Sequence, residues 1–337
     1  MIIKKTVTDI EDALYKHKDW VNNNGGERLR LLEYSGDLKS RQLSYADFRK
    51  SKLSDVSFEH AELIGANFYG AEIARTKFTA AELRGVDMRE VVLKEEVTFV
   101  GATLEGASLE GAYLANASFA VAIMPKACLD GVVAEDGADF AYTKMQGATF
   151  VKAILQNASL PDVVLSSANL SFADLTGASA PRAKLDRANM KNVIADGADF
   201  SLSKFIDSYL VSISLEGANC WQADFSYANL GKARCKGAIF KDAIMLSAGL
   251  GSADLSLTDF TNAKLRGTNL AYANASGAIF KKADLRGARV TDADFTNADF
   301  TDANLEGVDF TGANLEGAKL DPEVKKQIFK SKENKGS

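Results

Sequence analysis

The sequence has little of what usually carries chemistry. It contains three cysteines and two histidines in 337 residues, too few for a disulfide framework and without the spacing of a Cys/His zinc site. No glycine-rich phosphate loop ends in Lys-Ser or Lys-Thr. Basic and acidic side chains nearly balance, 40 against 45, whereas nucleic-acid-binding domains are usually strongly basic. We therefore predict no metal, no cofactor, no enzymatic activity and no direct contact with nucleic acid.

Long apolar runs are also missing. No stretch approaches the roughly 18 apolar residues that a membrane-spanning helix needs, so no contact with a membrane is predicted. The opening residues, MIIKKTVTDIEDAL, carry charges where a secretory signal needs an apolar core. Apolar residues still make up 46% of the chain, enough to bury a large core. These features predict a reduced, cytoplasmic protein.

What the sequence has instead is a repeat of five residues. Between Phe140 and Leu320, every fifth residue is Leu, Phe, Met or Val in 32 of 37 cases, and Ala usually stands two residues earlier. Gly, Asn or Asp often follows two residues later, as at Gly147 and Asn157. A period of five is neither that of a helix nor that of a simple strand. Each step is therefore predicted to have a small and a large inward residue, followed by a corner where Gly, Asn and Asp tolerate the turning backbone.

The phenylalanines indicate how many steps complete one turn. Between Phe140 and Leu320, six of the eleven phenylalanines at step centres fall in one column of 20-residue intervals, which includes Phe140, Phe200 and Phe240. Four steps per turn would stack these rings on successive coils about 4.8 Å apart. Backbone groups would then pair between coils, as a β-solenoid requires.

The steps resemble those of the pentapeptide-repeat family, whose motif is A-(D/N)-L-x-G or A-(D/N)-F-x-x. The motif is present as Ala168-Asn169-Leu170 and Ala253-Asp254-Leu255, and at residues 313–317 as ANLEG. The resemblance implies an all-β fold, a right-handed quadrilateral parallel β-helix with four pentapeptides per coil. Over residues 36–320, about 57 pentapeptides would make about 14 coils.

The repeat changes register twice. One extra residue enters near 94–98 and another near 135–139, and both are expected at the same corner, two coils apart. Both insertions carry acids, Glu95 and Glu96 in the first and Glu135 and Asp136 in the second. We consider these acids a candidate recognition feature. The alternative is that the insertions only relieve twist and that their acids are solvated.

The two ends lie outside the repeat. Residues 1–35 are predicted as an N-terminal cap with a helix over 9–21, where apolar residues recur at helical spacing and Trp20 is expected to plug the first coil. This segment resembles an extension of some bacterial and phage members of the family. Residues 321–337 are predicted as a short C-terminal cap helix, packed through Val324, Ile328 and Phe329, and a disordered tail from Lys330. The resemblance also implies that a terminal cap can join two copies, so a monomer or an end-to-end homodimer is expected.

Two features of the predicted surface depart from the plain repeat. Residues 231–290 carry ten basic and four acidic side chains, whereas residues 291–320 carry seven acidic and one basic. Leu202, Ile206, Trp221 and Leu246 occupy outward positions and are expected to converge on one edge of square coils. A clustered apolar edge is a candidate partner contact. The alternative is an incidental, uneven surface.

These observations favour a non-enzymatic scaffold that presents a rigid, rod-like surface to a protein partner of unknown identity. A second hypothesis follows from the resemblance. Some bacterial pentapeptide-repeat proteins mimic double-stranded DNA and bind a type II topoisomerase, inhibiting or protecting DNA gyrase. The acidic stretch at 291–320 and the acidic insertions support DNA mimicry here. The basic stretch at 231–290 and the lack of a long loop between coils depart from that pattern.

Overall fold

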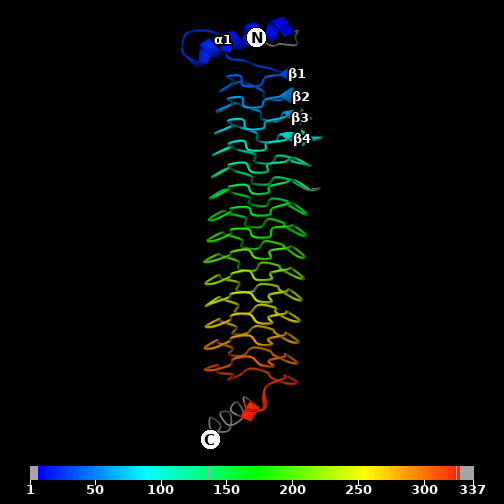
Figure 1. Ribbon diagram of the computed structural model, residues 1–337, viewed down its shortest axis with the longest axis vertical. Helices are drawn as coiled ribbons and strands as arrows, with labels where there is room; N and C mark the ends of the chain where they lie inside the picture. Colours follow the sequence, from blue (N-terminus) through cyan, green and yellow to red (C-terminus); the bar gives the residue numbers. More distant parts are fainter. Residues whose placement is uncertain (1–6, 135–136, 324, 327–337) are drawn as a thin grey trace. The chain divides into compact units, whose positions relative to one another are not determined.

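The computed structural model describes residues 7–134, 137–323 and 325–326. The chain forms two compact units, Met1–Asp174 and Leu175–Ser337. In the first unit, helix α1 precedes four short parallel strands that lie side by side in chain order (Figure 1). The elements are α1 (Val7–Val21), β1 (Glu33–Asp37), β2 (Lys52–Ser57), β3 (Glu72–Ala74) and β4 (Val92–Lys94). Over the described ranges, no helix is long and apolar enough to cross a membrane.

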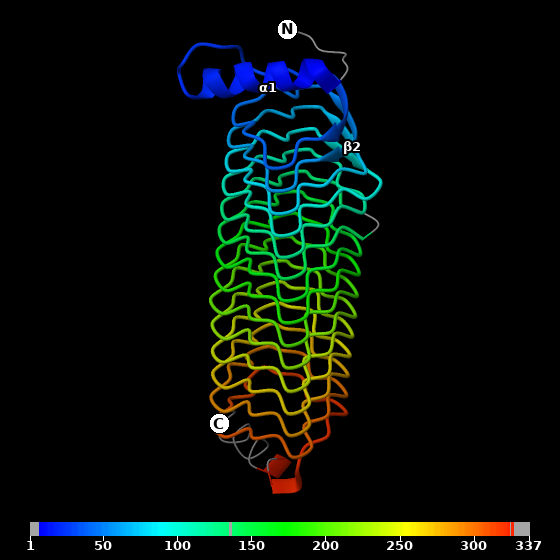
Figure 2. The ribbon, with the colours of Figure 1, turned by 45° about the horizontal axis from the view of Figure 1, so that its top comes forward.

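Coils of four steps build both units. In the first unit Gln42 pairs with Glu62 and Glu62 pairs with Glu82, always in parallel, and in the second Lys184 pairs with Lys204. Partners 20 residues apart are what four pentapeptides per turn require. The predicted parallel β-helical solenoid is therefore confirmed within each unit. Figure 2 shows the coils of the first unit wound beneath α1.

The interior holds the residues that the repeat predicts. The alanines and the large apolar side chains at step centres are buried almost without exception. Phenylalanines from successive coils stack face to face, with ring centroids 5.3 Å apart for Phe240 and Phe260 and 5.0 Å for Phe260 and Phe280. The predicted stacking of one column is confirmed. Such stacking fills a narrow core without voids, which close-packed protein interiors require.

The corners take the left-handed backbone conformation. The second residue after a step centre repeatedly has a positive φ, for example 56° at Asn157 and 68° at Gly147. Glycine adopts this region freely, and Asn and Asp adopt it more readily than other residues with a Cβ. The corner residues of the motif are thus there for the backbone, and a bulky apolar residue at a corner is an exception with a conformational cost.

The N-terminal segment differs from its prediction in two ways. Helix α1 begins at Val7, two residues before the predicted start, and it buries Ile10, Leu14 and His17 along one face. Trp20 is exposed and stacks on His17, with ring centroids 5.7 Å apart. The prediction that Trp20 plugs the first coil is wrong, because the 10–14–17 face points inward and places the smaller imidazole there.

The boundaries of the β-helix can also be compared with the sequence. Ladder pairing begins at Arg30, which bridges to Asp47, before the expected start at 36, because residues 29–34 pair with the first coil without carrying the repeat. At the other end, residues 322, 323, 325 and 326 are helical, and the Lys325 N–H donates to the Asp321 C=O at 2.9 Å. The predicted contacts of Val324, Ile328 and Phe329, and the tail from Lys330, lie outside the described residues.

Candidate functional site

The first acidic insertion lies directly after β4. Glu95 and Glu96 both have positive φ, 45° and 42°, and both are exposed. The Glu95 carboxylate pairs with the guanidinium of Arg75, which also donates two hydrogen bonds of 2.8 Å to Asp55. These hydrogen bonds from Arg75 hold the pKa of the Asp55 carboxyl below its usual value. Arg75 therefore offsets one of the two negative charges of Asp55 and Glu95, and Glu96 adds a further acidic side chain to this surface.

The second acidic insertion, Glu135 and Asp136, lies outside the described residues. The residues before the two insertions do share a column, because Val92 bridges to Tyr113 and Tyr113 bridges to Val133. The insertions therefore enter the first unit after the same face of the coil, two coils apart.

The apolar residues singled out in the second unit lie at two successive corners. Leu202 and Trp221 are neighbours, since the Leu202 N–H donates to the Trp221 C=O at 2.8 Å, and their exposed fractions are 40% and 38%. The Trp221 indole N–H donates to the Asp242 carboxylate at 3.2 Å. Ile206 and Leu246 are half-buried and belong to the next corner, because each step centre is followed by its own turn. Leu202 and Trp221 therefore form one pair, whereas Ile206 and Leu246 lie two coils apart at the next corner with Ser226 between them, so the four side chains do not converge on one edge.

A further apolar patch lies in the first unit, at positions for which no site was predicted from the sequence. It consists of Val121 and Tyr142, with exposed fractions of 55% and 57%, and of Ile123, which is 40% exposed, follows two residues after Val121 and lies between Thr103 and Lys144 in the ladder. The Val121 N–H donates to the Ala141 C=O at 2.8 Å, which places Val121 beside Tyr142 on the adjacent coil. The sequence did contain a signal, because the run AVAIMP at residues 120–125 puts apolar residues at outward positions that are polar in most steps.

The backbone at Val121 carries a conformational cost. Its φ is 60°, in the left-handed region, where the corresponding residue of the preceding coil is Gly101 with φ 67°. A β-branched residue is disfavoured there, and the left-handed conformation costs a residue with a Cβ roughly 1–2 kcal/mol. An exposed valine at this corner contributes nothing to the core that offsets the cost. Other corner residues with a Cβ, such as Phe172 and Leu257, share this conformation, so the cost belongs to the corner and does not by itself mark a site.

The basic stretch of the second unit gathers around one face of the coil. Lys264 lies in a ladder column between Ile244 and Asp284. Basic residues occupy the corners on either side of this column, namely Lys241, Lys281, Lys282, Arg266 and Arg286. The hydrogen bond from Arg286, at 2.7 Å, and then the nearby charge of Arg266 hold the pKa of Asp284 below its usual value. This face is positive, which is the opposite of a DNA-like surface.

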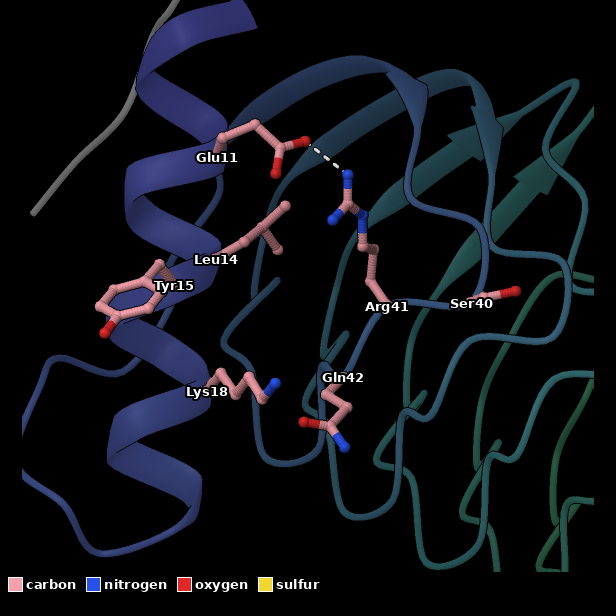
Figure 3. Close-up of a pocket in the computed structure, with 7 residues that line it drawn as sticks. All are labelled: Glu11, Leu14, Tyr15, Lys18, Ser40, Arg41 and Gln42. Carbon is pink, nitrogen blue, oxygen red and sulfur yellow. Dashed lines mark hydrogen bonds and ion pairs between the residues drawn. The ribbon is translucent and has the colours of Figure 1, made fainter.

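A cavity of about 420 Å³ lies between α1 and the first coil (Figure 3). Its lining residues are Glu11, Leu14, Tyr15, Lys18, Ser40, Arg41 and Gln42. Glu11 and Arg41 form an ion pair that joins the helix to the coil. Beside it, His17 is fully buried and its Nδ1 accepts a hydrogen bond of 3.0 Å from the Leu29 N–H. Burial lowers the pKa of His17, so the imidazole is neutral at neutral pH.

The side-chain chemistry is sparse. Within the parts of the chain that the structure describes, no three His, Cys, Asp or Glu side chains are grouped so that they could hold a metal ion. Cys220 and Cys235 occupy step centres, and burial raises the pKa of both thiols. A buried thiol with a raised pKa is a poor nucleophile. The features of this surface that suit recognition are its apolar and charged side chains and the cavity beside α1.

Comparison with known proteins identifies the repeat. The profile of the family described as pentapeptide repeats matches eight segments, which together span well over half of the chain: 42–79, 99–133, 143–179, 183–219, 203–242, 218–256, 253–292 and 291–321. A search of curated proteins finds no match.

Solved structures of pentapeptide-repeat proteins are among the matches. HetL, from the cyanobacterium Nostoc sp. strain PCC 7120 and involved in heterocyst differentiation regulation, is 22% identical, with 93% of this chain and 98% of that chain covered and a TM-score of 0.22. QnrB1, a plasmid-mediated fluoroquinolone resistance protein, is 22% identical, with coverage of 60% and 94% and a TM-score of 0.25. Rfr23, from the cyanobacterium Cyanothece 51142, is 30% identical, with coverage of 31% and 64% and a TM-score of 0.16. TM-scores this low do not assign a partner to this chain.

Proposed function

Because the chain belongs to the pentapeptide-repeat family, we propose that it is a non-enzymatic, cytoplasmic scaffold that presents fixed side chains to a protein partner. The observation that carries this proposal is the apolar patch of Val121, Ile123 and Tyr142. Exposed apolar side chains that adjoin one another are typical of contact sites, whereas isolated ones are not.

The coil geometry suits such a role. Each patch residue is fixed by ladder hydrogen bonds on the coil, as with the bond from the Val121 N–H to the Ala141 C=O. A surface already held in its binding conformation loses less conformational entropy on association. The Leu202–Trp221 pair in the second unit is a second proposed contact, because tryptophan is enriched among residues that dominate binding energy. Ile206 and Leu246 would adjoin that contact from the next corner.

The terminal segments complete the proposal. We propose that α1 and the segment from Asp321 close the ends of a solenoid of about 14 coils and shield its strand edges from aggregation. The buried Ile10, Leu14 and His17 of α1 support this role at the N-terminal end.

A substitution that preserves the backbone tests the scaffold function. Val121→Gly combined with Tyr142→Gly removes both side chains at corners where glycine relieves strain, so the fold is expected to stay intact. Ala80→Gly, at the corresponding exposed corner of another coil, is the matched control. Partners captured from cells by wild-type protein are identified by mass spectrometry, purified and titrated against each variant. We expect at least tenfold weaker binding for the double variant and no change for Ala80→Gly.

Trp221→Glu extends the same measurement to the second unit. Loss of a partner that the first-unit variant still binds would assign that partner to the Leu202–Trp221 pair. A partner bound equally by the wild type, the double-glycine variant and Trp221→Glu would contradict the scaffold proposal at both surfaces.

DNA mimicry is a second candidate function, and the acidic stretch at 291–320 favours it. In this proposal its carboxylates, with Glu96 and the insertion at Glu135 and Asp136, stand in for phosphates and bind a type II topoisomerase such as DNA gyrase. The ion pair of Glu95 with Arg75 and the basic face around Lys264 weaken the argument. A gyrase supercoiling assay with and without the protein tests it. Unchanged supercoiling at micromolar protein would rule out mimicry.

A further inference from the structure

The N-terminal side of the first coil is only partly covered by β-structure. Residues 29–34 complete the ladder along part of it: the Asp47 N–H donates to the Leu29 C=O at 2.8 Å, and the Lys52 N–H donates to the Leu32 C=O at 2.7 Å. Over residues 40–44, helix α1 lies on this side of the coil in place of a strand. A helix satisfies its backbone groups internally, so α1 cannot continue a β-ladder there.

Gln42 is the first residue of its ladder column. The equivalent residue of the next coil uses both backbone groups: the Glu62 N–H donates to the Arg41 C=O at 2.9 Å, and the Glu62 C=O accepts from the Leu43 N–H at 2.7 Å. Among the residues that the structure describes, neither the N–H nor the C=O of Gln42 has a hydrogen-bond partner of this kind. An exposed, unpaired N–H and C=O are the edge of a sheet, which accepts another extended strand.

The cavity beside α1 opens onto this edge. Its volume of about 420 Å³ lies in the range of sites that bind small ligands. Figure 3 shows the Leu14 side chain directed toward the coil, and Lys18 and Gln42 facing each other across the gap. The Glu11 carboxylate is engaged by Arg41, so Lys18 is a lining cation with no acidic partner among the described side chains. Beside the Glu11–Arg41 ion pair, a ligand here meets the two backbone groups of Gln42, the Lys18 ammonium group and the Leu14 side chain.

We propose that this groove binds a short extended peptide that carries a carboxylate side chain, a site that rests on the proposed scaffold function. The peptide backbone pairs with the N–H and C=O of Gln42, and its carboxylate binds the Lys18 ammonium group. An apolar neighbour in the peptide packs on Leu14. This is strand addition, in which main-chain hydrogen bonds give affinity and side-chain contacts give selectivity.

A pair of proline substitutions tests whether the edge is open. Gln42→Pro removes an N–H that has no ladder partner, so the urea midpoint is expected to change little. Glu62→Pro removes an N–H that donates across the ladder, so its midpoint is expected to fall clearly. The backbone amide of Gln42 should likewise exchange with solvent faster than that of Glu62. Equal destabilisation by the two prolines, or a protected Gln42 amide in the free protein, would overturn the proposal because the edge would already be occupied.

Binding is tested with a fluorescein-labelled probe, the peptide Thr-Val-Glu-Val-Thr with blocked ends, by fluorescence anisotropy. We expect saturable binding, weakened at least tenfold by Gln42→Pro, by Lys18→Glu, and by Gln in place of Glu in the probe. Lys50→Glu changes a cation of the first coil outside the cavity, so it is expected to bind like the wild type. No saturable binding at millimolar protein, or equal binding by all variants, would overturn the proposal.

Two outcomes separate this groove from the scaffold function and from self-association. If the probe fails to bind while partner capture still depends on Val121 and Tyr142, the groove proposal falls and the scaffold stands. If light scattering shows concentration-dependent dimers that Gln42→Pro abolishes, the occupant is a second copy of the chain, and the peptide assignment is wrong.

Discussion

The two units fill their interiors with phenylalanine in different arrangements. In the first unit, Phe78, Phe99 and Phe119 belong to one uninterrupted column, with neighbouring centroids 4.7 Å and 4.6 Å apart and ring planes within 2° of parallel. In the second unit the corresponding column is interrupted by Cys220. There, Phe205 and Phe225 stack at 4.5 Å one step further along the coil.

The second unit shows how a stack moves from one column to the next. Phe200 meets Phe205 edge to face at 5.3 Å, and Phe225 meets Phe240 edge to face at 5.5 Å. The ring that would occupy position 220 is replaced by rings in the adjacent column. The comparison shows that the column that supplies the stacked rings can change from one coil to the next.

The largest expected effect on the free energy of unfolding comes from removing one ring of the uninterrupted phenylalanine column. Phe99→Ala leaves a cavity between Phe78 and Phe119, and substitutions of this kind cost about 3–5 kcal/mol in the free energy of unfolding. Phe172→Ala removes the same side chain from an exposed corner and is expected to cost less than about 0.5 kcal/mol. Urea denaturation measures both. Similar losses for the two variants would show that the stacked column is not where the stability of the first unit lies.

A smaller effect is expected from restoring the interrupted column. Cys220→Phe places a ring where Phe205 and Phe225 already supply the volume, and overpacking of this kind costs about 1–3 kcal/mol. Combining it with Phe225→Leu frees space and should recover part of the loss. The unfolding midpoints of the single and double variants measure this coupling. A stabilising single Cys220→Phe would mean that the second unit has a void where the comparison assigns none.

The smallest expected effect on stability concerns Asp299, a charged residue of the ladder, and not the apolar core beneath it. Burial opposes ionisation of Asp299, next to Phe300, but hydrogen bonds from the Thr301 hydroxyl and N–H and from Lys319, with the charge of Lys281, lower its pKa to about 2. An unfolded aspartate has a pKa of about 3.9. The ionised carboxylate therefore stabilises the fold above about pH 4, and this stabilisation is lost as the pH falls toward 2.

The size of this acid-dependent term is on the order of 1–2 kcal/mol. Asp299→Asn should remove that part of the loss of stability between about pH 4 and pH 2, whereas Asp302→Asn, at an exposed corner nearby, should keep it. Unfolding midpoints measured across this pH range provide the test. An identical acid response in Asp299→Asn and wild type would place the acid sensitivity elsewhere in the chain.

The corners show how far the sequence could be used to predict a site. Val121 was detectable in principle, because an apolar run replaces the usual polar outward residues at 120–125. That Val121 adjoins Tyr142 follows only from the coil-to-coil hydrogen bond. Leu202 and Trp221 were placed together correctly, while Ile206 was assigned to their edge because the turn after each centre was not counted as a separate corner. The charge of Glu95 was predicted, but its offset by Arg75 depends on side-chain geometry in three dimensions.

The sequence by itself determined the coil: a period of five sets which side chains face inward, and 20-residue columns set the number of steps per turn. These properties are local and repeat from step to step, so they can be read without knowledge of distant contacts. Only the tertiary structure decided that His17 and not Trp20 lies against the first coil, and that among the described residues no strand precedes Gln42 in its ladder column. Both depend on how a non-repeating segment packs on the repeat, and no periodic pattern encodes that packing.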